Sequence, residues 1–332
     1  MKNPAKKPSG CVRIGLYGSN GHQLPLTFPA SVRAQVIAVV DGAFDPDGRL
    51  RDSVRRHATL EALLDDPAVD LVSLCSPQRV DQAADALRCL AAGKHVLAEK
   101  PCVFHPEMLD NILAMAAQHN CTFREMGGME LAAPLQAIRR LVDAGALGTI
   151  VQVQAQKSYP WHDRRPSDIA VDGGLVRQTG IHAVRYIHGA TGLRIARVRG
   201  VSTPLGNPGP GSLAMAAAFV VELENGGVGT INLNYLNPSN FGAWGNDMFR
   251  VCGTKGMAES VDGFRRHALY LPERGDRTEL PIPKDLPSPL YIEHYVNFLL
   301  DGTPMPTSFE EELAMTRAML ALHSASLSPT GS

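Results

Sequence analysis

Two groups of residues in this sequence are suited to acid–base chemistry. The first is Glu99-Lys100-Pro101, which follows a short apolar run, His95–Ala98, that predicts a buried strand. The second is the run Asp172–His188, in which Gln178 and His182 are four residues apart and would share one face of a helix. A lysine and a histidine can each hold or release a proton beside a reacting oxygen. Gln178 cannot accept a proton, so we expect it to orient a ligand by hydrogen bonds.

The lysine needs an element that brings it to a ligand. Gly93 follows an apolar-periodic run and predicts a helix end, because glycine enters the left-handed region at little cost. The strand His95–Ala98 then delivers Lys100 to the carboxyl end of a parallel sheet, where open α/β sheets bind ligands. The plainer alternative for Glu99 and Lys100 is a solvated surface ion pair.

A glycine turn near the N-terminus indicates a nucleotide. Val12–Gly18 is an apolar run that ends in glycine, so the context predicts a strand, a turn and then a helix. If Gly18 is the first glycine of a GxGxxG fingerprint, Asn20 and Gln23 hold the second and third positions, with Gly21 between them. Asn tolerates a left-handed conformation, whereas Gln23 does not allow the close helix–strand approach of the third glycine. A plain turn is the alternative.

The end of the second predicted strand bears on the choice of cofactor. Gln35–Val40 is apolar and leads to Asp41, 23 residues after Gly18, near the interval of about 20 expected for an acid that binds the ribose hydroxyls. A carboxylate there disfavours a 2′-phosphate and so favours NAD over NADP. The alternative is that Asp41 only opens the turn that follows. Between the glycine turn and this strand, Pro29 would break or kink a helix.

Composition limits the class of protein. The 332 residues are 44% hydrophobic, which suffices for two domains and a large core. A net charge of −1 gives no electrostatic footprint for nucleic acid or an anionic membrane, and no apolar stretch approaches the length of a membrane span. The six cysteines are scattered and the N-terminus lacks an apolar export segment, so we expect a cytoplasmic protein with reduced thiols. No residues have metal-ligand spacing, so we expect no metal.

Local patterns predict most of the remaining elements. Four segments alternate between apolar and polar residues and predict a mainly antiparallel sheet in the second half, with Asn225-Gly226 as a hairpin turn. These strands are Thr149–Lys157, Ala214–Leu223, Gly227–Leu236 and Met248–Cys252. Strands are also predicted at Asp70–Cys75 and Thr122–Glu125, and helices at Thr59–Leu64, His105–Gln118, Leu135–Ala144 and from Ser308 to about Leu322.

Three motifs together resemble the Gfo/Idh/MocA family, which includes glucose–fructose oxidoreductase and inositol dehydrogenase. They are DLVSLCSPQRVDQAADALRCLAAGKHVLAEKP at 70–101, DGGLVRQTGIHAVRYIH at 172–188 and GTKG at 253–256. The resemblance extends from about Arg13 to Leu327. It implies an α/β protein with a disordered lead-in at 1–11 and a Rossmann domain with a doubly wound parallel sheet at 12–126. Residues 127–332 would form an α/β domain with a large open, mainly antiparallel sheet for substrate binding and oligomerisation.

The resemblance also implies roles for individual residues. In much of the family the EKP lysine and the Asp and His of a DxGxH motif surround the substrate hydroxyl, which implies catalytic roles for Lys100 and His182. Here Gln178 replaces the Asp, so the usual carboxylate is absent. The aromatic and cationic residues at 159–165 suit a polyhydroxylated or acidic substrate, although an ordinary loop is the alternative. The expected substrate-binding residues are Gln178, Trp161, His162, Tyr159 and Arg185. The expected cofactor-binding residues are Gly18, Asn20, Gly21, His22, Asp41, Ser76, Pro77, Glu99 and Lys100.

The implied function is NAD-dependent hydride transfer between the nicotinamide and a sugar, polyol or related hydroxyl carbon. One alternative uses NAD transiently in a lyase, glycosidase or epimerase. A second alternative is a redox-inactive dinucleotide-binding sensor or scaffold, which the imperfect glycine fingerprint, Pro29 and Gln178 would favour. Relatives usually assemble through the open sheet, so we expect a homodimer or homotetramer with a small-molecule substrate, and neither a nucleic-acid nor a membrane partner.

Overall fold

The chain folds into two compact units. The computed structural model describes residues 8, 10–40 and 54–327. The first unit comprises residues 1–127, 170–173 and 290–309, and the second comprises 128–169, 174–289 and 310–332. The chain first passes between the units within one residue of the boundary expected after residue 126, but that single division omits the two later segments that return to the first unit. Most of the predicted lead-in, and Asp41, lie outside the described residues.

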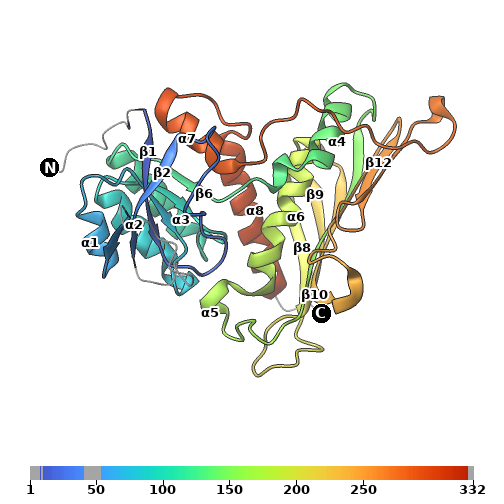
Figure 1. Cartoon of the computed structure of the whole chain (residues 1–332). Helices are drawn as coiled ribbons and strands as arrows, with labels where there is room; N and C mark the ends of the chain where they lie inside the picture. The colour runs from blue at the N-terminus through green and yellow to red at the C-terminus, as the bar shows by residue number, and fades with distance from the viewer. Residues whose placement is uncertain (1–7, 9, 41–53, 328–332) are drawn as a thin grey trace. The chain divides into compact units, whose positions relative to one another are not determined.

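A parallel six-stranded sheet forms the centre of the first unit (Figure 1). Its order, β3-β2-β1-β4-β5-β6, is that of a dinucleotide-binding doubly wound sheet, as predicted. Every neighbouring pair is parallel. The strands are β1 (Val12–Tyr17), β2 (Ala34–Val40), β3 (Arg55–His57), β4 (Leu71–Leu74), β5 (His95–Ala98) and β6 (Phe123–Glu125).

The helix expected after the glycine turn is absent. Residues 18–33 connect β1 to β2 without any helix, so the predicted strand–turn–helix context is incomplete. Pro25 and Pro29 explain the difference, because a proline in a helix interior removes a hydrogen bond and clashes with the preceding turn. The helices of this unit are α1 (Leu60–Leu64), α2 (Gln82–Ala91), α3 (Pro106–Gln118) and α7 (Tyr291–Asp301).

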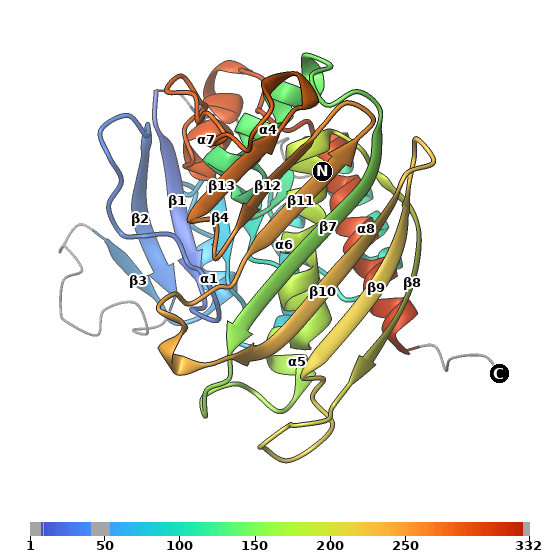
Figure 2. The same cartoon turned by 90° about the vertical axis from the view of Figure 1, so that its right-hand side faces the viewer.

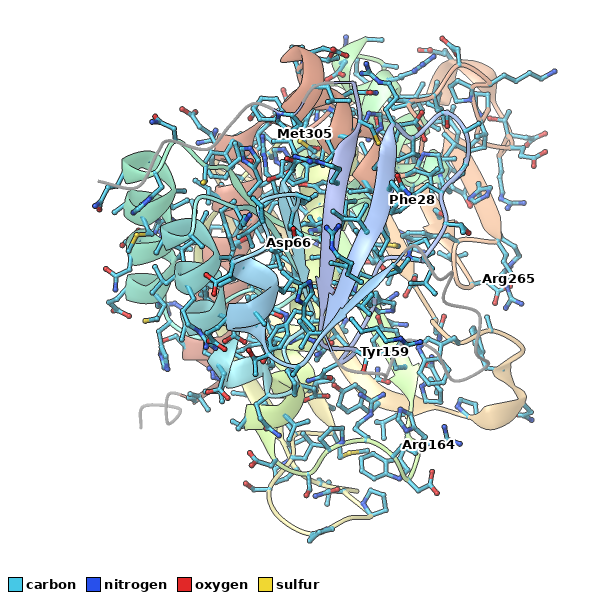
Figure 3. All side chains as sticks on the ribbon, turned by 60° about the vertical axis from the view of Figure 1, so that its left-hand side comes forward. Phe28, Asp66, Tyr159, Arg164, Arg265 and Met305 are labelled. Carbon is cyan, nitrogen blue, oxygen red and sulfur yellow. The ribbon has the colours of Figure 1, made fainter. Side chains whose placement is uncertain are left out.

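Helix α7 returns to the first unit and packs on β1. Its buried Tyr291, Tyr295 and Val296 belong to one cluster with Ile14 and Leu16. From the connection between β1 and β2, partly buried apolar residues, including Phe28 (labelled in Figure 3), pack against the same cluster. The fragment that follows β1 therefore contributes to this core as a loop rather than as a helix.

The second unit is built on a seven-stranded sheet, seen face-on in Figure 2. The order is β13-β12-β11-β7-β10-β9-β8, and the only parallel neighbours among the described strands are β7 and β10. The mainly antiparallel sheet is thus confirmed, although β8 and β13 were not predicted. The strands are β7 (Ile150–Pro160), β8 (Ile195–Thr203), β9 (Ala216–Leu223), β10 (Val228–Asn237), β11 (Met248–Gly253), β12 (Met257–Val261) and β13 (Arg266–Tyr270).

One face of this sheet is covered by helices. The helices of the second unit are α4 (Ala133–Asp143), α6 (Gly174–Thr191) and most of α8 (Phe309–Leu327). The short helix α5 (Ile169–Asp172) begins in the second unit and ends in the first. Helix α6 packs closely, since a Cβ on Gly180 would lie 3.3 Å from Leu322 and 3.5 Å from Leu233. The other face exposes Val151, Val201, Val220, Val228 and Leu236. These side chains are consistent with the predicted assembly through the sheet, which stays a prediction. No helix in the described parts of the chain is long and apolar enough to cross a membrane.

Candidate functional site

The glycine turn after β1 is closely packed against the end of β4. Gly18 has φ +72°, and a Cβ there would lie 1.9 Å from the Cys75 carbonyl oxygen, so only glycine fits. The Asn20 backbone N–H donates to that same carbonyl at 3.2 Å. Its side-chain Nδ2 donates to the carbonyls of Pro77 (3.2 Å) and Val171 (2.5 Å). The tight turn therefore survives with Asn in the second glycine position.

Gln23 fills the place of the third glycine in an unexpected way. Its Nε2 donates to the carbonyls of Tyr17, Gly18 and Ser73 at 3.2, 3.0 and 3.3 Å. Its Oε1 accepts hydrogen bonds from the Ser73 hydroxyl at 2.5 Å and the Leu24 N–H at 2.8 Å. The amide thus satisfies backbone groups at the ends of β1 and β4, and the chain leaves the sheet as a loop.

A cavity of about 570 Å³ opens at the carboxyl ends of β1 and β2. This is where doubly wound sheets bind nucleotides, and the volume is within the usual range for ligand pockets. The residues fit the adenosine part of a dinucleotide. They do not include the N-terminus of a helix directly after β1, which usually receives the pyrophosphate. The turn after β1 would have to hold the phosphates in its place. The cavity is lined by Tyr17, Gly18, Ser19, Asn20, Val40, Ala58, Thr59, Leu60, Glu61, Pro77 and Arg88.

The corner formed by Glu99, Lys100 and Pro101 is buried and braced through its backbone. The Arg79 guanidinium donates to the carbonyls of Lys100 and Asn20. The Gln82 amide donates to the carbonyls of Glu99 (2.5 Å) and Pro101 (3.2 Å). Lys100 is 4% exposed. We did not predict roles for Arg79 and Gln82, because nothing local in the sequence shows that these polar side chains turn inward beneath the corner.

Glu99 connects this corner to the glycine turn. Its Oε1 accepts from the His22 backbone N–H at 3.2 Å and lies 3.0 Å from His22 Nδ1. Burial raises the pKa of Glu99, but the His22 hydrogen bond and the charges of Lys100 and Arg79 outweigh it and lower this pKa to about 2. A Cβ on Gly21 would lie 2.6 Å from the same carboxylate oxygen, so glycine is required there as well.

The Ser-Pro turn after β4 is held from within the first unit. The Ser76 hydroxyl donates to Asp85 Oδ2 at 2.6 Å, and its N–H donates to Gln82 Oε1 at 3.3 Å. Ser76 is fully buried, whereas Pro77 lines the cavity. Of these two predicted cofactor-binding residues, the structure therefore places only Pro77 in the wall of the cavity.

In the second unit, α6 carries His182 and, one turn earlier, Gln178. His182 is buried, and the ring of Tyr159 meets it edge-on with centroids 6.5 Å apart. Tyr159 lies near the end of β7 and Arg164 on the loop that follows (Figure 3). Gln178 is half-buried. The predicted Tyr159 and His182 thus adjoin each other.

Arg185, also expected to bind substrate, contacts a carboxylate of its own unit. Its Nε lies 3.8 Å from Glu130 Oε2, and both side chains are buried. The same Glu130 oxygen accepts the Gly128 N–H at 3.1 Å. Glu130 belongs to the short 3₁₀ helix Met129–Leu131, so Arg185 joins α6 to the start of the second unit. Its role toward substrate stays a prediction.

A buried polar cluster near Tyr159 was not found from the sequence. Lys157 Nζ pairs with Asp247 Oδ2 at 2.8 Å and lies 4.9 Å from the centroid of the Tyr159 ring. Burial lowers the pKa of Lys157, and Asp247 opposes this effect. Burial and the Asp247 charge raise the pKa of Tyr186.

The burial of Lys157 could have been predicted from its position in the alternating pattern of β7. Val153, Ala155 and Lys157 fall on one face, which makes the lysine an inward residue on an apolar side. In the described parts of the chain, no group of three His, Cys, Asp or Glu residues is placed to hold a metal ion.

Family sequence models match most of the chain. The model described as "Oxidoreductase family, NAD-binding Rossmann fold" matches residues 12–126. The model described as "GFO/IDH/MocA C-terminal domain" matches residues 135–259. The two matches follow each other in the order of the two units. This chain belongs to the Gfo/Idh/MocA family of oxidoreductases, whose N-terminal domain is an NAD-binding Rossmann fold.

Individual relatives share the family at low identity. A dTDP-3,4-didehydro-2,6-dideoxy-alpha-D-glucose 3-reductase of Streptomyces violaceoruber is 33% identical over 183 residues, 50% of this chain and 52% of the relative. The chain thus matches about half the length of that reductase. A trans-1,2-dihydrobenzene-1,2-diol dehydrogenase of Bos taurus is 26% identical over 82% of this chain and 79% of the relative. A solved structure from Thermotoga maritima has the same fold, with a TM-score of 0.82 and 22% identity over 95% of this chain and 98% of that one.

Proposed function

We propose that this protein transfers a hydride between NAD and a hydroxyl-bearing carbon of a sugar, polyol or related small molecule. The observation that carries the proposal is the cavity at the carboxyl ends of β1 and β2, because its wall contains the glycine turn and Pro77. The names of the Streptomyces and bovine relatives, a reductase of a nucleotide-linked sugar and a diol dehydrogenase, support a hydroxyl or carbonyl carbon as the reacting centre.

The residues of this chain handle the proton and the orientation of the substrate. NAD, when bound, supplies the acceptor or donor of the hydride. When a CH–OH group is oxidised to a carbonyl, the carbon loses a hydride and the oxygen loses a proton. We infer from the family resemblance that His182 takes that proton and returns it on reduction. The same resemblance implies that Lys100 stabilises negative charge on the substrate oxygen and that Gln178 orients the substrate by hydrogen bonds.

Calorimetric titration with NAD, followed by a screen of sugars and polyols for NADH formation, tests the proposal. Gly18→Ala should abolish measurable NAD binding, because the new Cβ would lie 1.9 Å from the Cys75 carbonyl oxygen and displace the turn. Gly10→Ala is the matched control, since Gly10 also has a positive φ but has no atom within 4 Å of the added Cβ. A native protein that binds no dinucleotide would overturn the proposal.

One observation favours a second function, a redox-inactive sensor or scaffold. The connection after β1 lacks the helix that usually receives the phosphates, and the Gln23 amide occupies the end of the sheet instead. Gln178→Asp separates the two functions, because it restores the usual carboxylate one turn from His182. Turnover in either protein supports hydride transfer. Firm NAD binding without turnover in both excludes exchange with free substrate. Transient use of NAD predicts that NAD copurifies and that a neighbouring bond is cleaved or epimerised without accumulation of NADH.

A further inference from the structure

Three aromatic rings gather near the end of β7 in the second unit. The Trp244 indole centroid lies 5.9 Å from that of Tyr159 and 5.7 Å from that of His162. Tyr159 in turn meets His182 edge-on. Trp244 is 57% exposed, unusually so for the largest apolar side chain. We call Tyr159, His162 and Trp244 the aromatic shelf.

The loop that carries Trp244 is anchored to β7 by buried polar groups. The Asn237 amide donates to the carbonyls of Ser158 (3.1 Å) and Trp244 (3.0 Å), and the Ser158 hydroxyl donates to Asn237 Oδ1 at 2.7 Å. At the far end of the loop, Lys157 pairs with Asp247 at 2.8 Å. Two successive residues of β7 therefore hold both ends of the loop. An exposed indole on such a support loses little conformational entropy when a ligand binds.

The inclination of the rings indicates the shape of the ligand. The indole plane makes angles of 42° with Tyr159 and 38° with His162, so the shelf is angled rather than flat. A planar aromatic ligand can lie flat on only one such ring. A sugar chair carries C–H groups on one face for aromatic contact and hydroxyls at its rim, which the imidazole of His162 can bond.

We propose that the aromatic shelf binds the apolar face of a closed sugar ring, with Trp244 as the stacking residue. The binding claim stands on the shelf alone. Only the further statement that this sugar is the substrate rests on the proposed function. If both hold, the substrate is a closed-ring carbohydrate rather than an open-chain polyol. Trp244 was not among the residues expected from the sequence.

Tryptophan fluorescence tests this without NAD. The chain has two tryptophans, so Trp161→Phe leaves Trp244 as the sole indole. This protein is titrated with methyl glucopyranoside, methyl galactopyranoside and methyl mannopyranoside, and with sorbitol, galactitol and mannitol as open-chain counterparts. We expect Trp244 emission to respond to at least one pyranoside, and that sugar to bind more tightly than its alditol.

Calorimetry with the responding pyranoside then measures the contribution of Trp244. In the native background, Trp244→Leu should weaken binding by about tenfold or more, as for a central aromatic contact. Leu236→Ala is the matched control, because Leu236 is 56% exposed in the same unit and outside the shelf. No pyranoside binding by the native protein in calorimetry, equal binding of the alditols, or an equal effect of the two substitutions would overturn the shelf. Pyranoside binding without NADH formation in any sugar screen would instead count against the proposed function and leave the shelf standing.

Discussion

Each unit buries a lysine at or near the end of a strand, and the two lysines are held differently. In the first unit the corner at Lys100 is braced through carbonyl groups, to which Arg79 and Gln82 donate. In the second unit Lys157 is held by its own ammonium, which pairs with Asp247. The carbonyl groups around Lys100 are held by other side chains, and the Lys100 charge also lowers the pKa of the neighbouring Glu99. At Lys157 the ion pair itself holds the side chain. Burial alone therefore does not identify a catalytic lysine, and the way each lysine is held predicts what its removal will do.

The largest effect is expected from breaking the ion pair of the second unit. Lys157→Met leaves Asp247 buried without its partner, which should lower the free energy of unfolding by about 3–5 kcal/mol. Urea titration followed by tryptophan fluorescence reports on this unit, because Trp161 and Trp244 both belong to it. Adding Asp247→Leu should recover most of the loss, since no buried charge remains. An equal loss in both variants would contradict an ion pair as the anchor.

The first unit buries a histidine in its neutral form, in contrast to the charged pair of the second. Burial lowers the pKa of His95 from 6.5 to about 4, and its Nδ1 accepts the Thr122 N–H at 3.0 Å. Between pH 6.5 and about 4, His95 is therefore protonated in the unfolded chain and neutral in the folded chain. Stability is complete above pH 6.5 and should fall by about 3 kcal/mol as the pH falls to about 4.

Urea titration followed by circular dichroism across this pH range measures the loss, and His95→Gln should remove most of it. The Glu99 carboxylate adds a separate loss in the same direction, because its pKa is lowered from 4.5 to about 2. That stability is complete above pH 4.5 and disappears as the pH falls toward 2, so data above pH 4.5 exclude Glu99. Burial also lowers the pKa of His267, so the difference between native protein and His95→Gln is what measures the contribution of His95. An unchanged slope in His95→Gln would disprove the assignment.

The next prediction concerns the contribution of Lys100 to catalysis. Lys100→Ala should lower kcat by about 10²-fold or more, the usual loss for a positioned proton-transfer or charge-stabilising group. Lys94→Met is the matched control at the other end of β5, because its buried ammonium donates to the carbonyls of Asp66 (2.7 Å) and Val69 (2.9 Å). It should lower stability and spare kcat. Comparable kcat values for native protein and Lys100→Ala would remove Lys100 from the mechanism.

The smallest effect concerns the cofactor of the first unit. A carboxylate at Asp41 beside a 2′-phosphate is repulsive, so NAD should bind at least about tenfold more tightly than NADP, or about 1.4 kcal/mol. Paired calorimetric titrations measure the ratio, and Asp41→Ser should reduce it. Equal affinities of the native protein for NAD and NADP would favour the alternative, in which Asp41 only begins the turn after the second strand.

Local patterns predicted the elements whose signals are complete within a few residues. The apolar run His95–Ala98 forms β5, and the alternating segments of the second half form β7, β9, β10 and β11. Helix α7 was missed, because Tyr291, Ile292 and Val296 have strand propensity and the helix is stabilised by packing on β1. The helix after the glycine turn was the opposite case, since the fingerprint suggested it and the prolines prevented it.

The sequence by itself determined the family, the order of the two sheets and the local position of Lys100 and His182, because these depend on motifs and periodicity. Only the tertiary structure decided which polar side chains are buried and which residues they contact. Lys157 and Asp247 are 90 residues apart in the sequence. Tyr159 and Trp244 are also distant in the sequence, and the sheet brings them together. The physical reason is that burying a charge or orienting an exposed ring depends on partners supplied by another strand or loop, and no local pattern encodes them.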